Sequence, residues 1–266
     1  MIKNDFEIIT RKIVTKDDVK VYPVGDLHVG AIQANLKGWE KFNQIILDDP
    51  NAYVVFLGDM MNNATKSSVS NVYEEIMRPR DQKIYLKEHL ADLAKANKIL
   101  AILPGNHENR AGKDADDSPL YDVAAKLDLE DFYRDNAAII KLFVGQEKRP
   151  NVYTLFATHG VGSGKFVGSV ANTYERYALN WEGIDIFYFA HSHKPFITKP
   201  NKLYVDAQRG DVKQRNTIVT TCTSWLAYGG YPVRGLMAPS HQADPDQPMI
   251  STFSAKHCKK AIRFIW

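Results

Sequence analysis

The 266-residue sequence has little cysteine, no long apolar run and no strong excess of charge. Its two cysteines, Cys222 and Cys258, form no C-x-x-C pair, so we interpret them as free thiols in a reducing compartment. The first residues lack the apolar core of a signal peptide, and no apolar run approaches the ~20 residues that span a bilayer. We therefore expect a soluble, cytoplasmic protein without a membrane partner.

Charge of neither sign dominates, because 34 Lys and Arg face 31 Asp and Glu to give a net charge of +3. This mildly basic balance permits a phosphate-bearing partner but does not require one. No linker rich in Pro, Gly or Ser and no internal repeat divides the chain, and the 44% of hydrophobic residues suffices for a sizeable core. We predict a single domain over residues 1–266 and leave the oligomeric state open.

Short apolar, β-branched runs recur along the chain and predict strands. They cover residues 6–14, 19–24, 52–57, 98–103, 137–144, 152–158, 185–190, 202–205, 216–222, 249–253 and 259–266. Helices are predicted between them at 33–47, 81–96, 116–127 and 169–179, the third with Ser118 as N-cap and Pro119 at its first position. The alternation in the first half favours parallel pairing, and we expect an α/β fold in which two sheets pack together with helices outside.

Residues that can bind a metal ion follow five of these apolar runs, each at the point where the run ends. They are Asp26 and His28; Asp59; Asn106, His107 and Glu108; His159; and His191 with His193. Singly, each has an ordinary explanation, since Gly-Asp after a strand is usually a turn and His-x-His is usually a surface pair. Ordinary loops give no reason for five of the eight histidines to follow strands. Because sites in open α/β sheets form beyond the carboxyl ends of strands, we predict that these side chains converge.

The chemistry of these side chains indicates which metal ions they suit. Carboxylate, imidazole and amide oxygen, without thiolate, favour Mn²⁺, Fe or Zn²⁺, and several imidazoles argue against Mg²⁺ or Ca²⁺ alone. Six or seven ligands suit two ions about 3.5–4 Å apart that share a carboxylate, bind phosphate oxygens and turn a bridging water into hydroxide. We expect two divalent metal ions, with Mn²⁺ first and Fe, Zn²⁺ or Ni²⁺ as alternatives. Asp26 and His28 are two residues apart, so an extended backbone would point both the same way.

In order, the chain reads DLH, GD, GNHE, THG and AHSH between residues 26 and 193. This set resembles the calcineurin-like metallophosphoesterases, whose pattern is D-x-H, G-D, G-N-H-[ED], H and G-H-x-H. The resemblance implies a β-sandwich of two mixed sheets flanked by α-helices, and hydrolysis of phosphate esters. It also implies two sets of metal ligands bridged by Asp59, which are Asp26, His28 and His193, and Asn106, His159 and His191. His107 would then contact the phosphate and protonate or orient the leaving group.

Two positions depart from the family pattern. Ala190 replaces the usual Gly before the last His-x-His, and its small side chain is expected to preserve close packing. Asn62 stands where many members carry an Asp that orients the catalytic histidine. Its amide can accept a hydrogen bond from imidazole, but it cannot stabilise imidazolium by charge, which weakens the case for His107 as an acid.

The motifs define the reaction more closely than the substrate. DLHVG resembles the DNA-repair nuclease branch, and residues 62–80 are similar to phosphoesterases of phages and prophages. GNHENR is similar to the protein phosphatases, which makes Arg110 a candidate phosphate ligand; the alternative is an exposed loop arginine. We favour phosphodiesters, nucleic acid included, so that a nuclease is one candidate. The alternatives are a phosphomonoesterase (a nucleotidase or protein phosphatase) and a non-catalytic binding scaffold.

Two further features bear on substrate binding. The aromatic residues Trp225, Tyr228 and Tyr231 follow a predicted strand and could stack on bases, although packing of a hairpin is the stronger interpretation. The segment HGVGSGKF fails the Walker pattern, and we interpret it as a loop beside the metals from which Lys165 reaches a phosphate.

Overall fold

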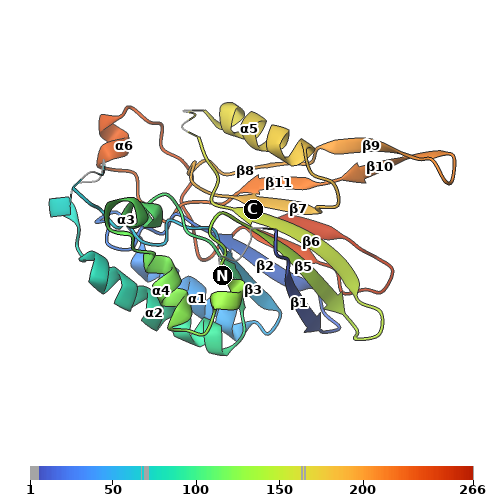
Figure 1. Cartoon of the computed structure of the whole chain (residues 1–266), viewed down its shortest axis with the longest axis horizontal. Coiled ribbons are helices and arrows are strands. Elements are labelled where there is room, and N and C mark those ends of the chain that lie inside the picture. The colour runs from blue at the N-terminus through green and yellow to red at the C-terminus, as the bar shows by residue number, and fades with distance from the viewer. Residues whose placement is uncertain (1–5, 67, 69–71, 163, 165, 266) are drawn as a thin grey trace.

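Two mixed β-sheets form the centre of the molecule, which the computed structural model describes over residues 6–66, 68, 72–162, 164 and 166–265 (Figure 1). The six-stranded sheet has the order β1 (Ile9–Val14), β5 (Ala137–Gly145), β6 (Asn151–Thr158), β7 (Ile186–Phe189), β11 (Ile218–Thr221) and β8 (Phe196–Thr198). The five-stranded sheet has the order β13 (Ile262–Ile265), β12 (Ile250–Phe253), β2 (Val19–Val24), β3 (Ala52–Phe56) and β4 (Ile99–Ile102). β2, β3 and β4 are parallel, whereas β12 pairs antiparallel with β2.

The main core lies between the two sheets. Val21 and Val55 of the five-stranded sheet belong to one buried cluster with Ile140, Leu155 and Tyr188 of the six-stranded sheet. Strands β4, β7 and β11 are buried at every residue, because helices or the partner sheet cover both of their faces. The predicted α/β fold of two packed mixed sheets is therefore confirmed, and each apolar run that predicted a strand overlaps one.

Helices cover the outer faces of both sheets (Figure 1). The helices α1 (Leu36–Asp48), α2 (Pro79–Lys95) and α4 (Pro119–Ala125) pack on the five-stranded sheet, and α5 (Val167–Leu179) packs on the six-stranded sheet. The short helices are η1 (Val72–Glu74), α3 (Glu108–Ala115), η2 (Glu130–Phe132) and α6 (Tyr231–Arg234). Ser118 is the N-cap of α4 and Pro119 its first residue, as predicted, although the Ser118 side chain makes no capping hydrogen bond.

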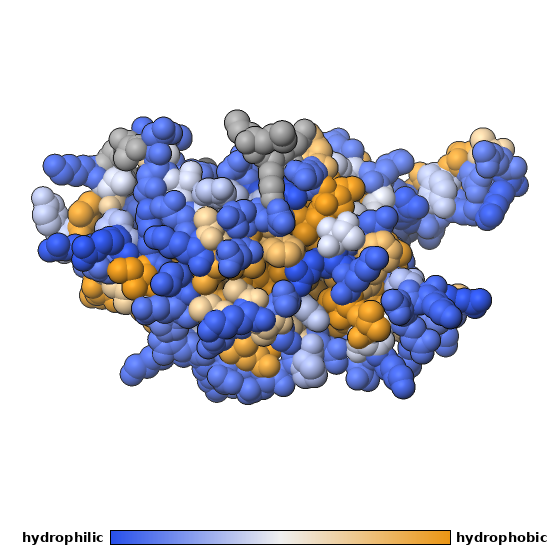
Figure 2. Space-filling view, turned by 60° about the horizontal axis from the view of Figure 1, so that its bottom comes forward, coloured by the Kyte–Doolittle hydropathy of each residue, from blue (hydrophilic) through white to orange (hydrophobic). Residues whose placement is uncertain are grey.

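A two-stranded hairpin extends away from the sandwich (Figure 1). It consists of β9 (Asn201–Asp206) and β10 (Asp211–Asn216), which pair antiparallel. Leu203, Val205 and Val212 are 69%, 72% and 60% exposed, and Figure 2 shows hydrophobic surface on the protruding arm. Among the described residues, no helix combines the length and hydrophobicity that a membrane span requires.

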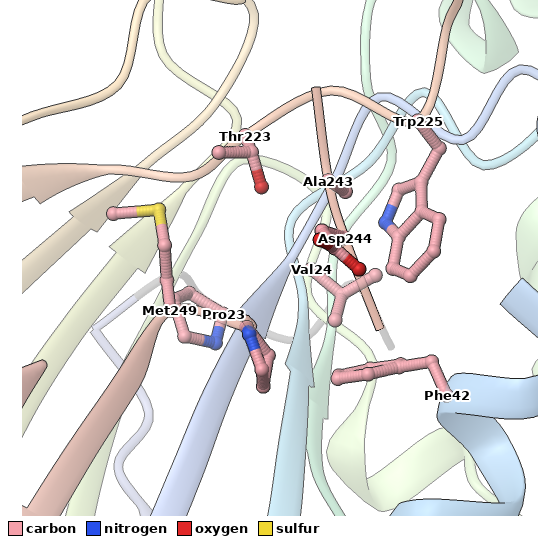
Figure 3. Close-up of a pocket in the computed structure, with 9 residues that line it drawn as sticks. Pro23, Val24, Phe42, Thr223, Trp225, Ala243, Asp244 and Met249 are labelled. Carbon is pink, nitrogen blue, oxygen red and sulfur yellow. The ribbon is translucent and has the colours of Figure 1, made fainter. Parts of the chain in front are cut away.

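Trp225 belongs to the core rather than to the surface. Its ring centroid lies 5.7 Å from that of Trp39 and 5.3 Å from that of Phe42, and the residue is 3% exposed. Figure 3 shows it beside Val24 and Phe42 in a small pocket. The idea that Trp225 stacks on bases is therefore wrong. Tyr228 is partly exposed and donates its hydroxyl to the Met237 carbonyl at 2.6 Å, whereas Lys165 and the Tyr231 side chain lie outside the described residues.

Candidate metal centre

The predicted ligands lie in the loops that follow β2, β3, β4, β6 and β7, at the carboxyl end of each strand. Two glycines let the loops after β3 and β4 approach closely. A Cβ atom at Gly58 would lie 2.3 Å from the backbone nitrogen of Gly105, and one at Gly105 would lie 2.1 Å from Oδ1 of Asp59. A side chain at Gly105 would therefore displace Asp59, and one at Gly58 would push the two loops apart.

Five of the predicted ligands adopt left-handed backbone conformations. The φ angles are 53° at Asp26, 52° at His28, 51° at Asp59, 65° at His191 and 52° at His193. Such conformations are uncommon outside glycine and concentrate at functional sites. Asp26 and His28 thus face a common point because their backbone is left-handed, and the expected extended backbone is wrong.

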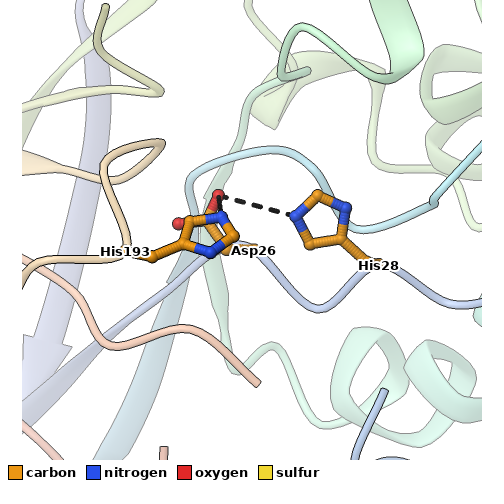
Figure 4. Close-up of side chains that lie close together, drawn as sticks. All are labelled: Asp26, His28 and His193. Atoms are coloured by element: carbon orange, nitrogen blue, oxygen red, sulfur yellow. Dashed lines mark ion pairs between the residues drawn. The ribbon is translucent and has the colours of Figure 1, made fainter. Parts of the chain in front are cut away.

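The first group of potential ligands consists of Asp26, His28 and His193 (Figure 4). Oδ1 of Asp26 lies 3.3 Å from Nε2 of His193 and 4.0 Å from Nε2 of His28. Asp26 and His28 are buried, and within the described part of the chain Asp26 Oδ1 and both ring nitrogens of His28 have no hydrogen-bond partner. Buried polar atoms left without partners are costly, and a cation between them would satisfy all three residues.

The second group consists of Asp59, His159 and His191, with Asn106 beside it. Nε2 of His159 lies 3.3 Å from Oδ2 of Asp59. Oδ1 of Asn106 lies 2.7 Å from Nδ1 of His191 and 3.0 Å from Nε2 of His159. Nδ1 of His159 donates to the Leu57 carbonyl at 2.8 Å, which leaves Nε2 to face the group.

Asp59 also connects the two groups, because its Oδ2 lies 3.8 Å from Nε2 of His28. The buried carboxylates and imidazoles of the centre also change one another's pKa values. Burial alone would lower the pKa of His159, but the Asp59 carboxylate outweighs it and raises that pKa to about 10. Burial, with nearby His107, holds the pKa of His28 well below its usual value. Without metal, imidazolium protons therefore balance the buried carboxylates, and bound cations would replace those protons.

His107 lies between the two groups and Arg110. Its Nδ1 donates to the backbone carbonyl of Asn62 at 2.7 Å, and its Nε2 accepts a hydrogen bond from Nη2 of Arg110 at 2.9 Å. The side-chain amide of Asn62, which could have accepted this hydrogen bond, does not do so: His107 bonds the backbone carbonyl instead, and Nδ2 of Asn62 donates to Glu75 at 2.8 Å. Arg110 is half-buried at the site, so the alternative of an exposed loop arginine is also wrong.

Glu108 holds the loops after β3 and β4 together, a role that the sequence did not predict. It is 2% exposed and accepts backbone N–H groups of Asp59 at 2.9 Å, Met61 at 2.8 Å and Gly105 at 2.7 Å. Burial, together with the nearby Asp59 charge, raises the pKa of Glu108 to about 7. The sequence signal for this role is the last letter of GNHE, which by itself indicates only a potential metal ligand.

The model of one protein family, described as calcineurin-like phosphoesterase, matches residues 19–195. This range contains all the predicted ligands and both groups. The chain belongs to the calcineurin-like phosphoesterases. A comparison of this phosphoesterase with curated proteins gives no match.

Solved structures with low overall similarity include two phosphoesterases. A predicted phosphoesterase from Streptococcus pneumoniae is 10% identical, with a TM-score of 0.36 over 93% of this chain and 88% of the other. A metallophosphoesterase from Sphaerobacter thermophilus is 9% identical, with a TM-score of 0.35 over 93% and 89%. At these values the two structures add nothing to the family assignment.

Proposed function

We propose that this phosphoesterase hydrolyses phosphate esters with two divalent metal ions, and that phosphodiesters are its preferred class. One observation carries the proposal: two groups of potential ligands lie side by side, and Asp59 belongs to the second while its Oδ2 is 3.8 Å from His28 of the first. The donor set fits cations, since it combines carboxylate and imidazole with buried atoms that lack other partners.

In this proposal each ion has its own ligands and both share Asp59. The first set is Asp26, His28 and His193, and the second is Asn106, His159 and His191. Two divalent cations, with Mn²⁺ expected, would supply Lewis acidity at the phosphoryl group and activate water as the nucleophile. Gly58 and Gly105 keep the shared carboxylate in place, since neither position accommodates a side chain.

His107 and Arg110 would act on the ester itself. The guanidinium of Arg110 would bind phosphate oxygens, which would release Nε2 of His107 toward the substrate. Because the Asn62 carbonyl fixes the proton on Nδ1, the neutral ring presents an acceptor at Nε2. To protonate a leaving group, His107 would first have to gain a proton there. Burial lowers the pKa of His107, whereas the nearby Asp59 carboxylate opposes that effect.

Two observations bear on whether the substrate is a phosphodiester or a phosphomonoester. The DLHVG segment resembles the nuclease branch and favours phosphodiesters. Arg110 beside His107 favours a phosphomonoester as the second candidate, because a guanidinium can hold two oxygens of a terminal phosphate.

The proposal is tested with bis- and mono-p-nitrophenyl phosphate and with single- and double-stranded DNA, each in the presence of Mn²⁺. We expect the diester to be cleaved with the higher kcat/KM. The His107→Ala variant should lose roughly 100-fold or more in kcat and retain its bound metal. His257→Ala is the matched control, because His257 is exposed near the start of β2, at the other end of the sandwich.

The proposal is wrong if no ester is cleaved with Mn²⁺, Fe, Zn²⁺ or Ni²⁺. Less than about one tightly bound ion per chain after Mn²⁺ loading would instead support a binding scaffold. Preferential cleavage of the monoester would make the second candidate correct.

A further inference from the structure

We propose that Glu75 is a positioning residue for His107, and that it acts through residues 62–64. This inference rests on the proposed function, in which His107 acts on the substrate ester. Glu75 follows η1 and touches neither group of potential ligands in any described contact.

The carboxylate of Glu75 holds the loop after β3 by side-chain and backbone hydrogen bonds. Its Oε1 accepts from Nδ2 of Asn62 at 2.8 Å and from the backbone N–H of Ala64 at 2.8 Å. Its Oε2 accepts from Nε2 of Gln82 at 2.8 Å. Gln82, fully buried on α2, in turn accepts the backbone N–H of Asn63 at 2.9 Å. Three consecutive residues are thereby fixed by one glutamate and one glutamine.

Two of these residues, Asn62 and Asn63, hold His107 at two points. The carbonyl of Asn62 accepts from Nδ1 of His107 at 2.7 Å, which sets the orientation of the ring. Nδ2 of Asn63 donates to the His107 carbonyl at 2.9 Å, which sets its backbone. Asn63 has a left-handed φ of 42°, a conformation that needs support from its surroundings. Glu75 supports Asn63 through Gln82 and through its contacts with the neighbouring Asn62 and Ala64, and would so fix where Nε2 of His107 points.

A role in loop folding alone would not call for this arrangement. A half-buried carboxylate has to be satisfied by several donors, whereas apolar contacts would anchor a surface loop at lower cost. Among the residues that the structure describes, the three donors to the Glu75 carboxylate come from Gln82 or from the segment that contacts His107. The geometry points to precise placement of the His107 ring as the result.

The test compares Glu75→Ala with Glu75→Gln by steady-state kinetics on bis-p-nitrophenyl phosphate. Glu75→Ala should lower kcat by roughly 10- to 100-fold, because a misplaced catalytic group loses about that much. In Glu75→Ala, the KM and the number of metal ions bound per chain should each change by less than about twofold. Glu75→Gln keeps an oxygen for Asn62 and Ala64 but loses the acceptor for Gln82, so it should retain a clearly higher kcat than Glu75→Ala without reaching that of the wild-type protein. The control is Glu88→Ala, which removes an exposed carboxylate from α2.

A second measurement does not depend on turnover. In metal-free protein labelled with ¹⁵N-histidine, the Nδ1–H proton of His107 should give a resonance protected from exchange. Glu75→Ala should lose it, and Glu75→Gln should keep it. The inference is overturned if Glu75→Ala retains both kcat and this resonance, or if it lowers only thermal stability. If the wild-type protein cleaves no ester, the proposed function fails, while the resonance still tests the positioning of His107.

Discussion

The ion pair between His159 and Asp59 makes the stability of the metal-free protein depend on pH. Burial alone would lower the pKa of His159, but the Asp59 carboxylate raises it from 6.5 to about 10. A raised pKa in the folded state contributes stability that is complete below the unfolded value of 6.5 and is lost as the pH rises through 10. From pH 7 to pH 10, at about 1.4 kcal/mol per pH unit, the free energy of unfolding should fall by roughly 4 kcal/mol.

Other groups in the centre do not mask this effect. The pKa of Glu108 is raised to about 7, so its own effect on stability is largely complete by the start of the range. Burial opposes a charge on His193, but Asp26 raises its pKa, so His193 acts in the same direction as His159. The lowered pKa values of His28 and His191, which follow mainly from burial, affect stability only on the acid side of 6.5.

The assay is urea unfolding in chelator at pH 7, 8, 9 and 10, for the wild-type protein and for Asp59→Asn. The variant should show a much shallower slope, since an amide no longer holds the His159 proton. Saturating Mn²⁺ should reverse the slope of the wild-type protein, because ligands must lose their protons to bind metal. Equal slopes for the metal-free wild-type protein and Asp59→Asn would refute the reasoning.

Three other substitutions test separate parts of the structure. Tyr174 donates its hydroxyl to the Val161 carbonyl at 3.0 Å, and its ring stacks on Phe189 with the centroids 4.1 Å apart. Tyr174→Phe keeps the stacked ring and should lower the free energy of unfolding in urea by about 1 kcal/mol. No loss would mean that the hydrogen bond contributes nothing. Trp225→Ala should cost roughly 3–5 kcal/mol by the same assay, and a cost typical of a surface site would contradict its place in the core. Arg110→Ala should raise KM for mono-p-nitrophenyl phosphate by about tenfold or more in steady-state kinetics, whereas an unchanged KM would exclude phosphate binding by Arg110.

The sequence predicted the architecture because its main signals are local. Apolar runs predicted the strands, and metal-capable residues at their ends indicated a common site once the strands were assumed to share a sheet edge. It did not predict the three-residue strand β8, nor β10, whose residues Asp211–Asn216 are polar except for Val212 and largely exposed on both faces, so that no hydrophobic periodicity marks the strand. Short polar helices such as α3 were not predicted either, because they too lack a hydrophobic periodicity.

The environment of Asn62 could not be read from its position in a motif. Side-chain hydrogen bonds depend on distances that emerge only when separate segments meet, and Glu75 lies 13 residues further along the chain. The sequence identified Asn62 as a departure from the family pattern, but the structure gives its carbonyl, not its amide, the contact with His107.

The turn of the β9–β10 hairpin lies at exposed residues 207–210. It divides the chain into two parts, and both large sheets contain strands from each part. All the predicted ligands precede this turn. The part that follows it supplies β11 to the six-stranded sheet, and β12 and β13 to the five-stranded sheet. Cutting the polypeptide there would give two fragments, one with the ligands and one with strands that complete the core around them. Metal binding would then report the association of the fragments, so the protein offers a natural division for a split reporter.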